Sequence, residues 1–214
     1  MSNAKICAVV INTINDFVHH YQSCPWQYLI ERDIQSDLFS RLRSQVGKPL
    51  HPMPKPKPEI EQKWEDKKII VNSVVSEYNP RDLPEHRSKR VDIVCLDPEK
   101  CNNPLVPWNG NPNHTNWVYS LPALIGIELK HFWAGTNRGY QDLIKDMDKM
   151  RMLKIEKRIA IGFVHTASFF DNSWKLIKKQ HKEKARLIGE ITKEGAIYLV
   201  SPSVGLESVI ELDV

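Results

Sequence analysis

The feature that most constrains the fold of this chain is the position of its prolines. Twelve of the 14 prolines lie between Pro49 and Pro122. Proline lacks a backbone N–H and has a fixed φ, so it is excluded from helix interiors and from central strands. The middle of the chain is therefore expected to be rich in loops, and the regular elements are expected toward the two ends.

Apolar residues at helical spacing predict the helices. A helix over 25–46 is expected because Pro25 suits the first helical position and apolar residues recur at every fourth position after it. This apolar stripe consists of Trp26, Ile30, Ile34, Leu38 and Leu42. Two further helices are expected, over 138–154 and over 174–188, and capping side chains at 171–173 precede the second.

Segments rich in β-branched residues predict five strands, over 68–76, 90–96, 124–130, 159–165 and 196–200. The resulting order is helix, three strands, helix, strand, helix, strand. This order predicts an α/β fold in which a central mixed β-sheet is flanked by α-helices. We expect a single domain over 1–214, with an extended Pro-rich tract at 48–58 and a loop insertion at 97–122.

The composition is that of a globular protein without a membrane span. Hydrophobic residues make up 41% of the chain and charged residues 26%, and no apolar run approaches the roughly 18 residues that a membrane helix needs. The apolar segment Ile6–Ile11 runs into Asn12, which makes it a poor secretory signal. The four cysteines form no CxxC pair, so we expect reduced thiols and a cytoplasmic location.

Two of the expected strands carry charged residues where a buried strand would not. Asp92 stands among apolar residues in the strand over 90–96. In the strand over 124–130, a period of two puts Glu128 and Lys130 on one face and the large apolar residues on the other. If the two strands are neighbours, Asp92 would lie beside this pair.

Two carboxylates beside an ammonium group are typical of a magnesium site that acts on phosphate esters. Mg²⁺ prefers hard oxygen ligands and keeps several waters, so one or two carboxylates and a substrate phosphate suffice to hold it. The metal would polarise a phosphoryl oxygen and lower the pKa of a bound water. A neighbouring lysine would stabilise the charge that develops on the phosphoryl group.

In this order along the chain, Asp92 followed by Glu128-Leu129-Lys130 resembles the D…(D/E)xK motif of the PD-(D/E)XK nuclease superfamily, which has the restriction-endonuclease-like fold. Members often carry a glutamate on the helix before the sheet, and Glu31 occupies that position. The expected order of elements is also similar. The chain departs from the motif in having Val91 before the aspartate and a separation of 36 residues between Asp92 and the glutamate, which requires the insertion at 97–122.

The resemblance implies a Mg²⁺-dependent endonuclease or exonuclease that hydrolyses the phosphodiester bonds of DNA, with Mn²⁺ able to substitute. Asp92 and Glu128 would bind the metal together with the backbone carbonyl of Leu129. Lys130 would position the attacking water. Glu31 would complete the catalytic group, either at a second metal site or through a metal-bound water.

Candidate accessory residues and DNA contacts lie elsewhere in the chain. Glu77 stands at a strand end, and Gln141 opens the crossover helix, where some relatives place a DNA-contacting glutamine. Residues 130–190 hold 14 basic and 7 acidic side chains, although the net charge of the whole chain is only +4. The helix over 174–188 carries the candidate phosphate contacts Lys175, Lys178, Lys179, Lys182 and Arg186.

Other interpretations remain open, because a Glu-x-Lys strand and a basic helix are each also typical of solvated faces. One alternative is a catalytically silent nucleic-acid-binding or assembly protein on the same fold. Another is an unrelated α/β protein, in which Asp92 and Glu128 would lie far apart. The expected partner is DNA, without a membrane, and a homodimer is an option because cutting both strands of a duplex takes two sites. The chain has no Walker A, GxGxxG or GxSxG motif, so nucleotide-driven motors, dinucleotide enzymes and serine hydrolases have no support.

Overall fold

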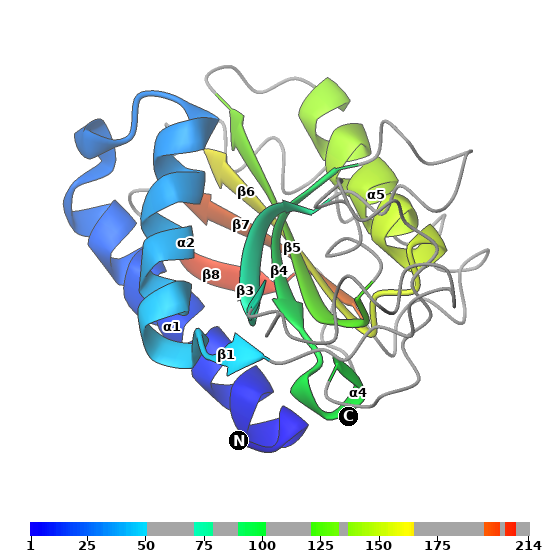
Figure 1. Cartoon of the computed structure of the whole chain (residues 1–214). Coiled ribbons are helices and arrows are strands. Elements are labelled where there is room, and N and C mark those ends of the chain that lie inside the picture. Colours follow the sequence, from blue (N-terminus) through cyan, green and yellow to red (C-terminus); the bar gives the residue numbers. More distant parts are fainter. Residues whose placement is uncertain are drawn as a thin grey trace, which may run out of the picture.

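The computed structural model describes residues 1–50, 71–78, 90–101, 121–132, 137–164, 195–201 and 204–208. Within these ranges, six strands form one mixed sheet in the order β3-β4-β5-β6-β7-β8 (Figure 1). The neighbours β5, β6 and β7 run parallel, whereas β3, β4 and β5 form an antiparallel meander and β8 returns antiparallel to β7. The predicted α/β fold with a central mixed sheet is thus confirmed.

The sheet strands are short at its β3 edge and longest at its centre. Their bounds are β3 (Val74–Tyr78), β4 (Val91–Leu96), β5 (Ala123–Phe132), β6 (Lys157–Val164), β7 (Gly195–Ser201) and β8 (Val204–Ser208). A separate antiparallel pair joins β1 (Pro49–Leu50) to β2 (Val71–Asn72). The beginning of the predicted Pro-rich tract is therefore a strand.

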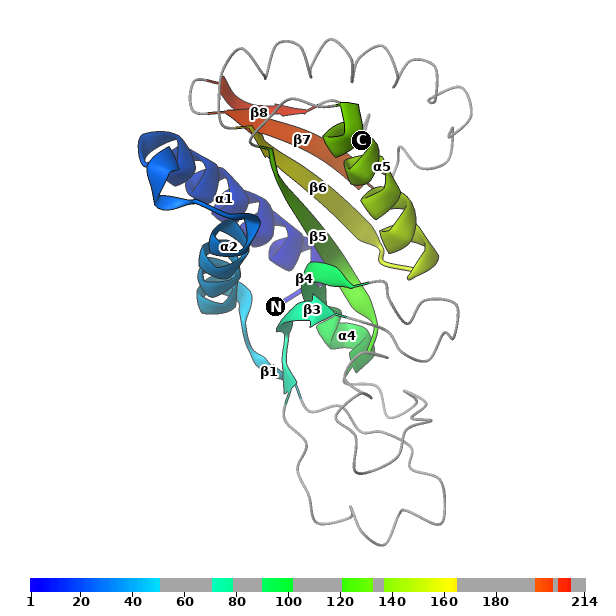
Figure 2. The ribbon, with the colours of Figure 1, turned by 90° about the horizontal axis from the view of Figure 1, so that it is seen from above.

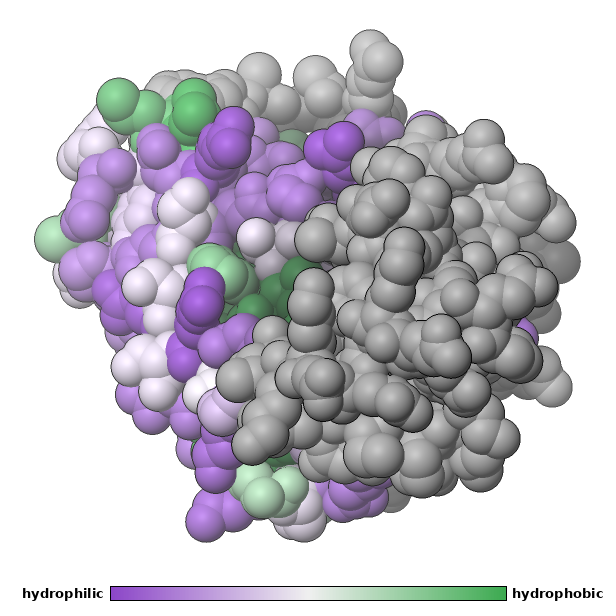
Figure 3. All heavy atoms as spheres, in the orientation of Figure 1, coloured by the Kyte–Doolittle hydropathy of each residue, from purple (hydrophilic) through white to green (hydrophobic). Residues whose placement is uncertain are grey.

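Helices cover both faces of the sheet (Figure 2). The helices α1 (Asn3–Ser23) and α2 (Glu31–Val46) lie on one face, and α5 (Asn137–Met152) lies on the other. The outward side of α2 is mainly hydrophilic (Figure 3), as expected for a helix whose apolar stripe faces the sheet. Two short helices, η1 (Pro25–Gln27) and α4 (Pro98–Cys101), precede α2 and follow β4.

Two apolar cores lie on opposite faces of the sheet, and β5 contributes to both. Its large apolar residues pack in the core that includes α1 and α2; they are Ile125, Ile127 and Leu129. Gly126 faces α5, since a Cβ built on it would lie 2.9 Å from both Met150 Sδ and Ile155 Cδ1. The predicted alternation of the strand is confirmed, and it turns Glu128 and Lys130 toward α5.

The helix α1 was not among the predicted elements, and it includes the apolar segment Ile6–Ile11. The helix spans 21 residues, and its buried side chains recur at helical spacing: Ile6, Val10, Thr13, Ile14, Phe17, Val18 and Tyr21. This spacing continues well beyond the apolar segment and would have revealed the helix. No helix within the described ranges is long and apolar enough to cross a membrane.

The predicted helix over 25–46 is wrong at its start. The carboxylate of Asp33 accepts a hydrogen bond from the Ile30 N–H at 3.1 Å, and α2 begins at Glu31. An acidic residue in the first turn that also satisfies a free N–H group favours a helix start at this point. Trp26 and Ile30 consequently leave the apolar stripe and are 74% and 55% exposed.

The remaining element predictions agree with the structure to different degrees. The segments 90–96 and 124–130 correspond to β4 and β5, and 138–154 corresponds to α5. The segment predicted as one strand over 68–76 falls on two strands, β2 and β3. The strand predicted over 196–200 is not the last one, because β8 follows it. The segment predicted as a loop insertion contains the short helix α4. The helix over 174–188 and positions 102–120 of the insertion lie outside the described residues.

Candidate functional site

The candidate site begins where β4 and β5 stop pairing. The paired register of these strands starts at Ile93 and Ile127. One residue earlier in β4, a side chain makes the contact to β5 in place of the backbone. The Oδ2 of Asp92 accepts a hydrogen bond from the Leu129 N–H at 2.8 Å. The carboxylate of Asp92 thereby lies next to Glu128 and Lys130, the residues on either side of Leu129 in β5.

Glu128 is the most buried acidic residue of this group, with 1% of its surface exposed. Its Oε1 lies 2.6 Å from the Nζ of Lys149, a half-buried side chain of α5. The predicted site did not include Lys149. Burying a carboxylate costs several kcal/mol unless a cation or hydrogen-bond donors accompany it, and the ammonium of Lys149 supplies that charge.

Lys130 connects the two helical layers. Its Nζ lies 3.3 Å from Asp146 Oδ2 in α5 and 3.8 Å from Glu31 Oε1 at the start of α2. Glu31 is fixed in turn by the His131 N–H, which donates to its Oε2 at 3.2 Å. The structure therefore brings together, at one end of β4 and β5, the four side chains that the sequence predicts for the site: Glu31, Asp92, Glu128 and Lys130.

Asp146 belongs to the same group of charges, although sequence reasoning did not identify it. Its Oδ1 lies 2.9 Å from Lys149 Nζ, so Asp146 contacts both lysines of the group. The sequence does contain a signal, because Asp146 and Lys149 directly precede the buried residues Met147 and Met150 of the helix. Charged residues beside an apolar stripe are common, however, and only the tertiary structure shows which strand they meet.

The electrostatics of the group are dominated by acidic side chains. Four carboxylates (Glu31, Asp92, Glu128 and Asp146) surround the two ammonium groups of Lys130 and Lys149. Burial raises the pKa of Asp92 to about 6, although the Leu129 N–H and the charge of Lys130 act in the opposite direction. Burial also raises the pKa of Glu128, and the charges of Asp92 and Asp146 add to this effect.

The pKa values of the two lysines are also raised, but by the neighbouring negative charges and against the effect of burial. Burial by itself lowers the pKa of Lys130, but the charges of Asp146, Glu31, Asp92 and Glu128 outweigh burial and raise it. The pKa of Lys149 is raised in the same way, by Glu128 and Asp146. Both lysines are therefore cations at neutral pH, and the fully ionised group carries two negative charges in excess.

The donor set fits a divalent cation of the Mg²⁺ type. Within the described part of the chain, no cluster of three or more His, Cys, Asp or Glu side chains is arranged to hold a metal ion, so a cage made of protein ligands alone is not present there. Mg²⁺ does not need such a cage, because it keeps several waters and accepts one or two carboxylates. Asp92 and Glu128 are two such carboxylates, and the Leu129 carbonyl is the further oxygen donor that the resemblance implies.

Glu77 lies beside the group without joining its ion pairs. It has φ of 52°, a left-handed conformation that is uncommon for a residue other than glycine. Its carboxylate accepts a hydrogen bond from Gln35 Nε2 at 3.0 Å and pairs with Arg90 at 3.4 Å. Gln35 also donates to the backbone carbonyl of Asp92 at 3.0 Å, so among the described residues Gln35 connects Glu77 to the group.

The other predicted contacts are not tested by the geometry. Gln141 lies in α5, and the structure describes its place in the helix but not its side chain. The basic residues proposed to contact DNA lie outside the described residues: Lys175, Lys178, Lys179, Lys182 and Arg186. The groove beside Glu77, lined by Arg32 and Phe39 of α2 and by Ser76 of β3, is an additional surface near the group that the sequence did not indicate.

The third interpretation from the sequence expected Asp92 and Glu128 to lie far apart. The hydrogen bond from the Leu129 N–H to Asp92, directly beside Glu128, is contrary to that expectation. The charge of Asp92 also raises the pKa of Glu128, as expected for a neighbouring carboxylate. Comparisons of the chain with protein-family models, with curated proteins and with solved structures find no match.

Proposed function

We propose that this protein is a Mg²⁺-dependent deoxyribonuclease built on a restriction-endonuclease-like core. The element order α2, β3, β4, β5, α5, β6 supports the proposal, since an antiparallel meander leads through a helix into a parallel strand. This is the order that the resemblance to PD-(D/E)XK nucleases implies. The proposal concerns the centre of the chain and does not depend on the residues outside the described ranges.

The observation that carries the proposal is the convergence of Asp92, Glu128 and Lys130 at one end of β4 and β5. Asp92 reaches this point because its carboxylate replaces a backbone partner of Leu129. Glu128 and Lys130 reach it because strand alternation turns both toward α5. Two carboxylates with raised pKa values beside a charged lysine are a combination that functional sites often contain and solvated strand faces rarely do.

In the proposed mechanism, Asp92, Glu128 and the Leu129 carbonyl would hold Mg²⁺. When bound, the ion supplies charge stabilisation at the phosphoryl group and acidifies a water. Lys130 donates a hydrogen bond that orients the attacking water, and its charge offsets the negative charge of the transition state. Glu31 and Asp146 hold the Lys130 ammonium from two sides, at 3.8 Å and 3.3 Å.

A catalytically silent nucleic-acid-binding protein is the second candidate function. The observation that favours it is the ion pair between Lys149 and Glu128. A carboxylate that is already paired with a lysine satisfies its charge without a metal, as in a purely structural ion pair. This candidate expects DNA binding that weakens with salt and no metal-dependent cleavage.

A cleavage assay with matched variants distinguishes the two functions. The purified chain is incubated with Mg²⁺ or Mn²⁺ and linear, circular, single-stranded or branched DNA. The variants are Asp92→Asn, Glu128→Gln and Lys130→Met, and the control is Asp142→Asn, which removes a half-exposed carboxylate of α5 that pairs only with Lys145 among the described contacts.

The proposal expects metal-dependent cleavage that each of the three variants reduces by about 10²-fold or more and that the control leaves within about twofold. Circular dichroism would check that each variant is folded. Full activity in any two of the three variants would refute the site assignment. DNA binding by the wild-type chain without cleavage under any metal condition would favour the silent protein.

A further inference from the structure

Lys149 stands in an unusual position for a lysine beside a metal-binding carboxylate. Its Nζ lies 2.6 Å from Glu128 Oε1 and 2.9 Å from Asp146 Oδ1. Only 16% of its side chain is exposed, and only 2% of the Glu128 side chain. The ammonium is thus held between two carboxylates in a half-buried place, and one of them is a ligand in the proposed metal site.

A cation at 2.6 Å from a ligand oxygen competes with a metal for that oxygen. Two positive charges that share one carboxylate repel each other, and the repulsion is strong where water is scarce. Metal binding at Glu128 therefore requires Lys149 to move away or to give up its closest contact. The contact to Asp146 offers a place to which the ammonium can withdraw, since Asp146 lies one turn earlier on the same helix.

We propose that Lys149 is a resident counter-ion of Glu128, which the metal displaces and which Asp146 then retains. The inference rests on the proposed function, because it assumes that Glu128 is a metal ligand. In the metal-free chain Lys149 keeps the buried carboxylate paired, so that the site stays folded. In the metal-bound chain the same lysine pairs with Asp146 alone.

This exchange requires no movement of α5 itself. The contact between Lys149 and Asp146 is an i,i+3 pair within one helix, so it persists when the contact to β5 is lost. Asp146 also contacts Lys130 through its other oxygen, at 3.3 Å. A closer approach of Lys149 to Asp146 would therefore weaken the ion pair between Asp146 and Lys130, the lysine proposed to orient the attacking water.

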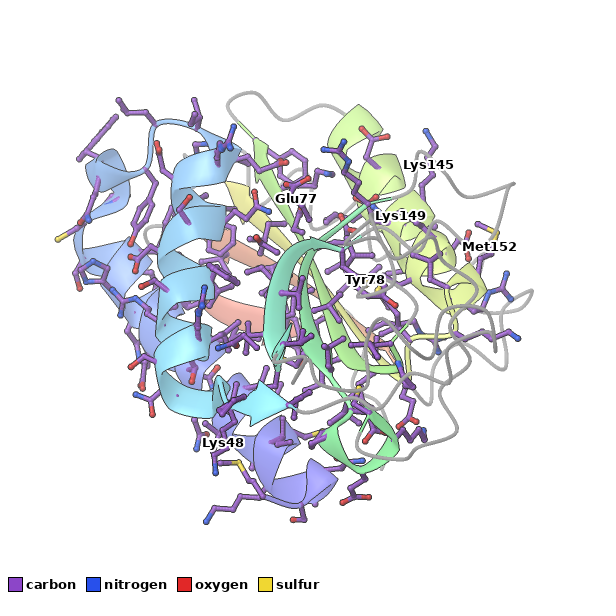
Figure 4. The ribbon with its side chains drawn as sticks, viewed as in Figure 1. Lys48, Glu77, Tyr78, Lys145, Lys149 and Met152 are labelled. Atoms are coloured by element: carbon purple, nitrogen blue, oxygen red, sulfur yellow. The ribbon has the colours of Figure 1, made fainter. Side chains whose placement is uncertain are left out.

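The chain provides a matched control one turn away. Lys145 lies on the same helix and also pairs with an aspartate three residues before it, Asp142, at 3.3 Å. Its side chain is 71% exposed, and Figure 4 shows it at the outer side of α5, whereas Lys149 lies on the side nearer the sheet. Lys145→Met removes the same charge from the same helix without touching the proposed site.

The test is the affinity for Mg²⁺, measured by titration calorimetry on the full chain without DNA at about pH 8.5, because carboxylate ligands must be deprotonated to bind the metal. Lys149→Met removes the competing cation, so Mg²⁺ should bind about tenfold tighter or more than to the wild type. Lys145→Met should stay within about twofold of the wild type. If Lys149→Met does not fold, Lys149→Gln is titrated in its place and should also bind more tightly.

The outcomes separate the inference from the proposed function. If the wild type binds Mg²⁺ and Lys149→Met or Lys149→Gln binds it equally or more weakly, the inference is overturned and the proposed function stands. If neither the wild type nor these variants bind Mg²⁺, the proposed function fails, and the inference fails with it. Tighter binding by the Lys149 variants together with unchanged binding by Lys145→Met supports both.

Discussion

At the scale of single residues, Asp92 has two roles, one in joining β4 to β5 and one in the proposed metal site. Its side chain accepts the Leu129 N–H that would otherwise lack a strand partner, and the same carboxylate is a proposed metal ligand. Strand alternation predicted that Glu128 and Lys130 share a face, because that depends only on local geometry. Asp146 and Lys149 could not be assigned from the sequence, because their role depends on where α5 crosses β5.

The raised pKa of Asp92 predicts how the stability of the metal-free chain depends on pH. Its pKa rises from the ordinary value near 3.8 to about 6 in the folded chain, so the folded state binds the proton more tightly than the unfolded state. The stabilisation is fully present below about pH 4 and is lost as the pH rises through about 6.

We expect Asp92→Asn to remove the part of this pH-dependent loss of stability that Asp92 causes. Urea unfolding in EDTA between about pH 4 and pH 7 should show a smaller decline in the free energy of unfolding for the variant than for the wild type. Asp142→Asn, at a half-exposed position of α5, serves as the control. Parallel pH profiles for Asp92→Asn and the wild type would contradict the burial of this carboxylate.

At the scale of elements, hydrogen bonds from Gln35 join α2 to β3 and β4. Gln35 of α2 donates to Glu77 in β3 and to the Asp92 carbonyl in β4, both at 3.0 Å. The α2 stripe was predicted correctly from Ile34 onward, because it follows from spacing alone. The start of α2 was not, because it depends on the hydrogen bond between the Ile30 N–H and Asp33. The helix α1 was not predicted either, although its buried residues recur at helical spacing.

Gln35→Leu should weaken both the fold and the proposed site. Losing two hydrogen bonds at a half-exposed place is expected to lower the free energy of unfolding by about 1–2 kcal/mol. Cleavage should fall further than stability accounts for, because the Asp92 backbone loses its support from α2. Gln45→Leu, at an exposed position of the same helix, is the comparison, and equal behaviour of the two variants in unfolding and cleavage assays would argue against this role.

The packing of β5 against α5 can be tested at Gly126. A methyl group at this position would lie 2.9 Å from Met150 Sδ and from Ile155 Cδ1, so Gly126→Ala is expected to cost about 1–3 kcal/mol of unfolding free energy. Met150→Ala makes room for the methyl group but costs about 2–5 kcal/mol by itself. The double variant should therefore lose at least about 0.5 kcal/mol less than the sum of the two single losses, and strict additivity in denaturant unfolding would contradict the contact.

At the scale of the whole molecule, sequence patterns predict most of the helices and strands in their order along the chain, but not the edge strand β8. The strands β4 and β5 and the helix α5 were predicted from β-branched segments and from helical spacing, whereas how the strands pair in the sheet is seen only in the structure. The strand β8 was missed because it is short and follows Pro202, a residue that usually ends regular structure. The placement of α1 against the same sheet face as α2 is a tertiary feature with no local signal.

Thiol labelling tests in solution which cysteines the fold buries. Cys24 is exposed, whereas Cys95 and Cys101 are buried, and burial raises the pKa of both buried thiols to about 12. Brief treatment of the native chain with iodoacetamide should modify Cys24 first and leave the two buried cysteines unmodified until denaturant is added. Peptide mass spectrometry reads out each site, and rapid native labelling of Cys95 would be incompatible with its burial in β4, between β3 and β5.

The central claim is that Asp92 and Glu128 share a divalent metal ion, and anomalous diffraction from a crystal of the full chain soaked in Mn²⁺ tests it most directly. The account predicts an anomalous peak within about 2.0–2.3 Å of oxygens from both carboxylates, with the Nζ of Lys149 moved away from Glu128 and still at Asp146. A soaked crystal with no peak between Asp92 and Glu128, and with Lys149 still paired to Glu128, would contradict it.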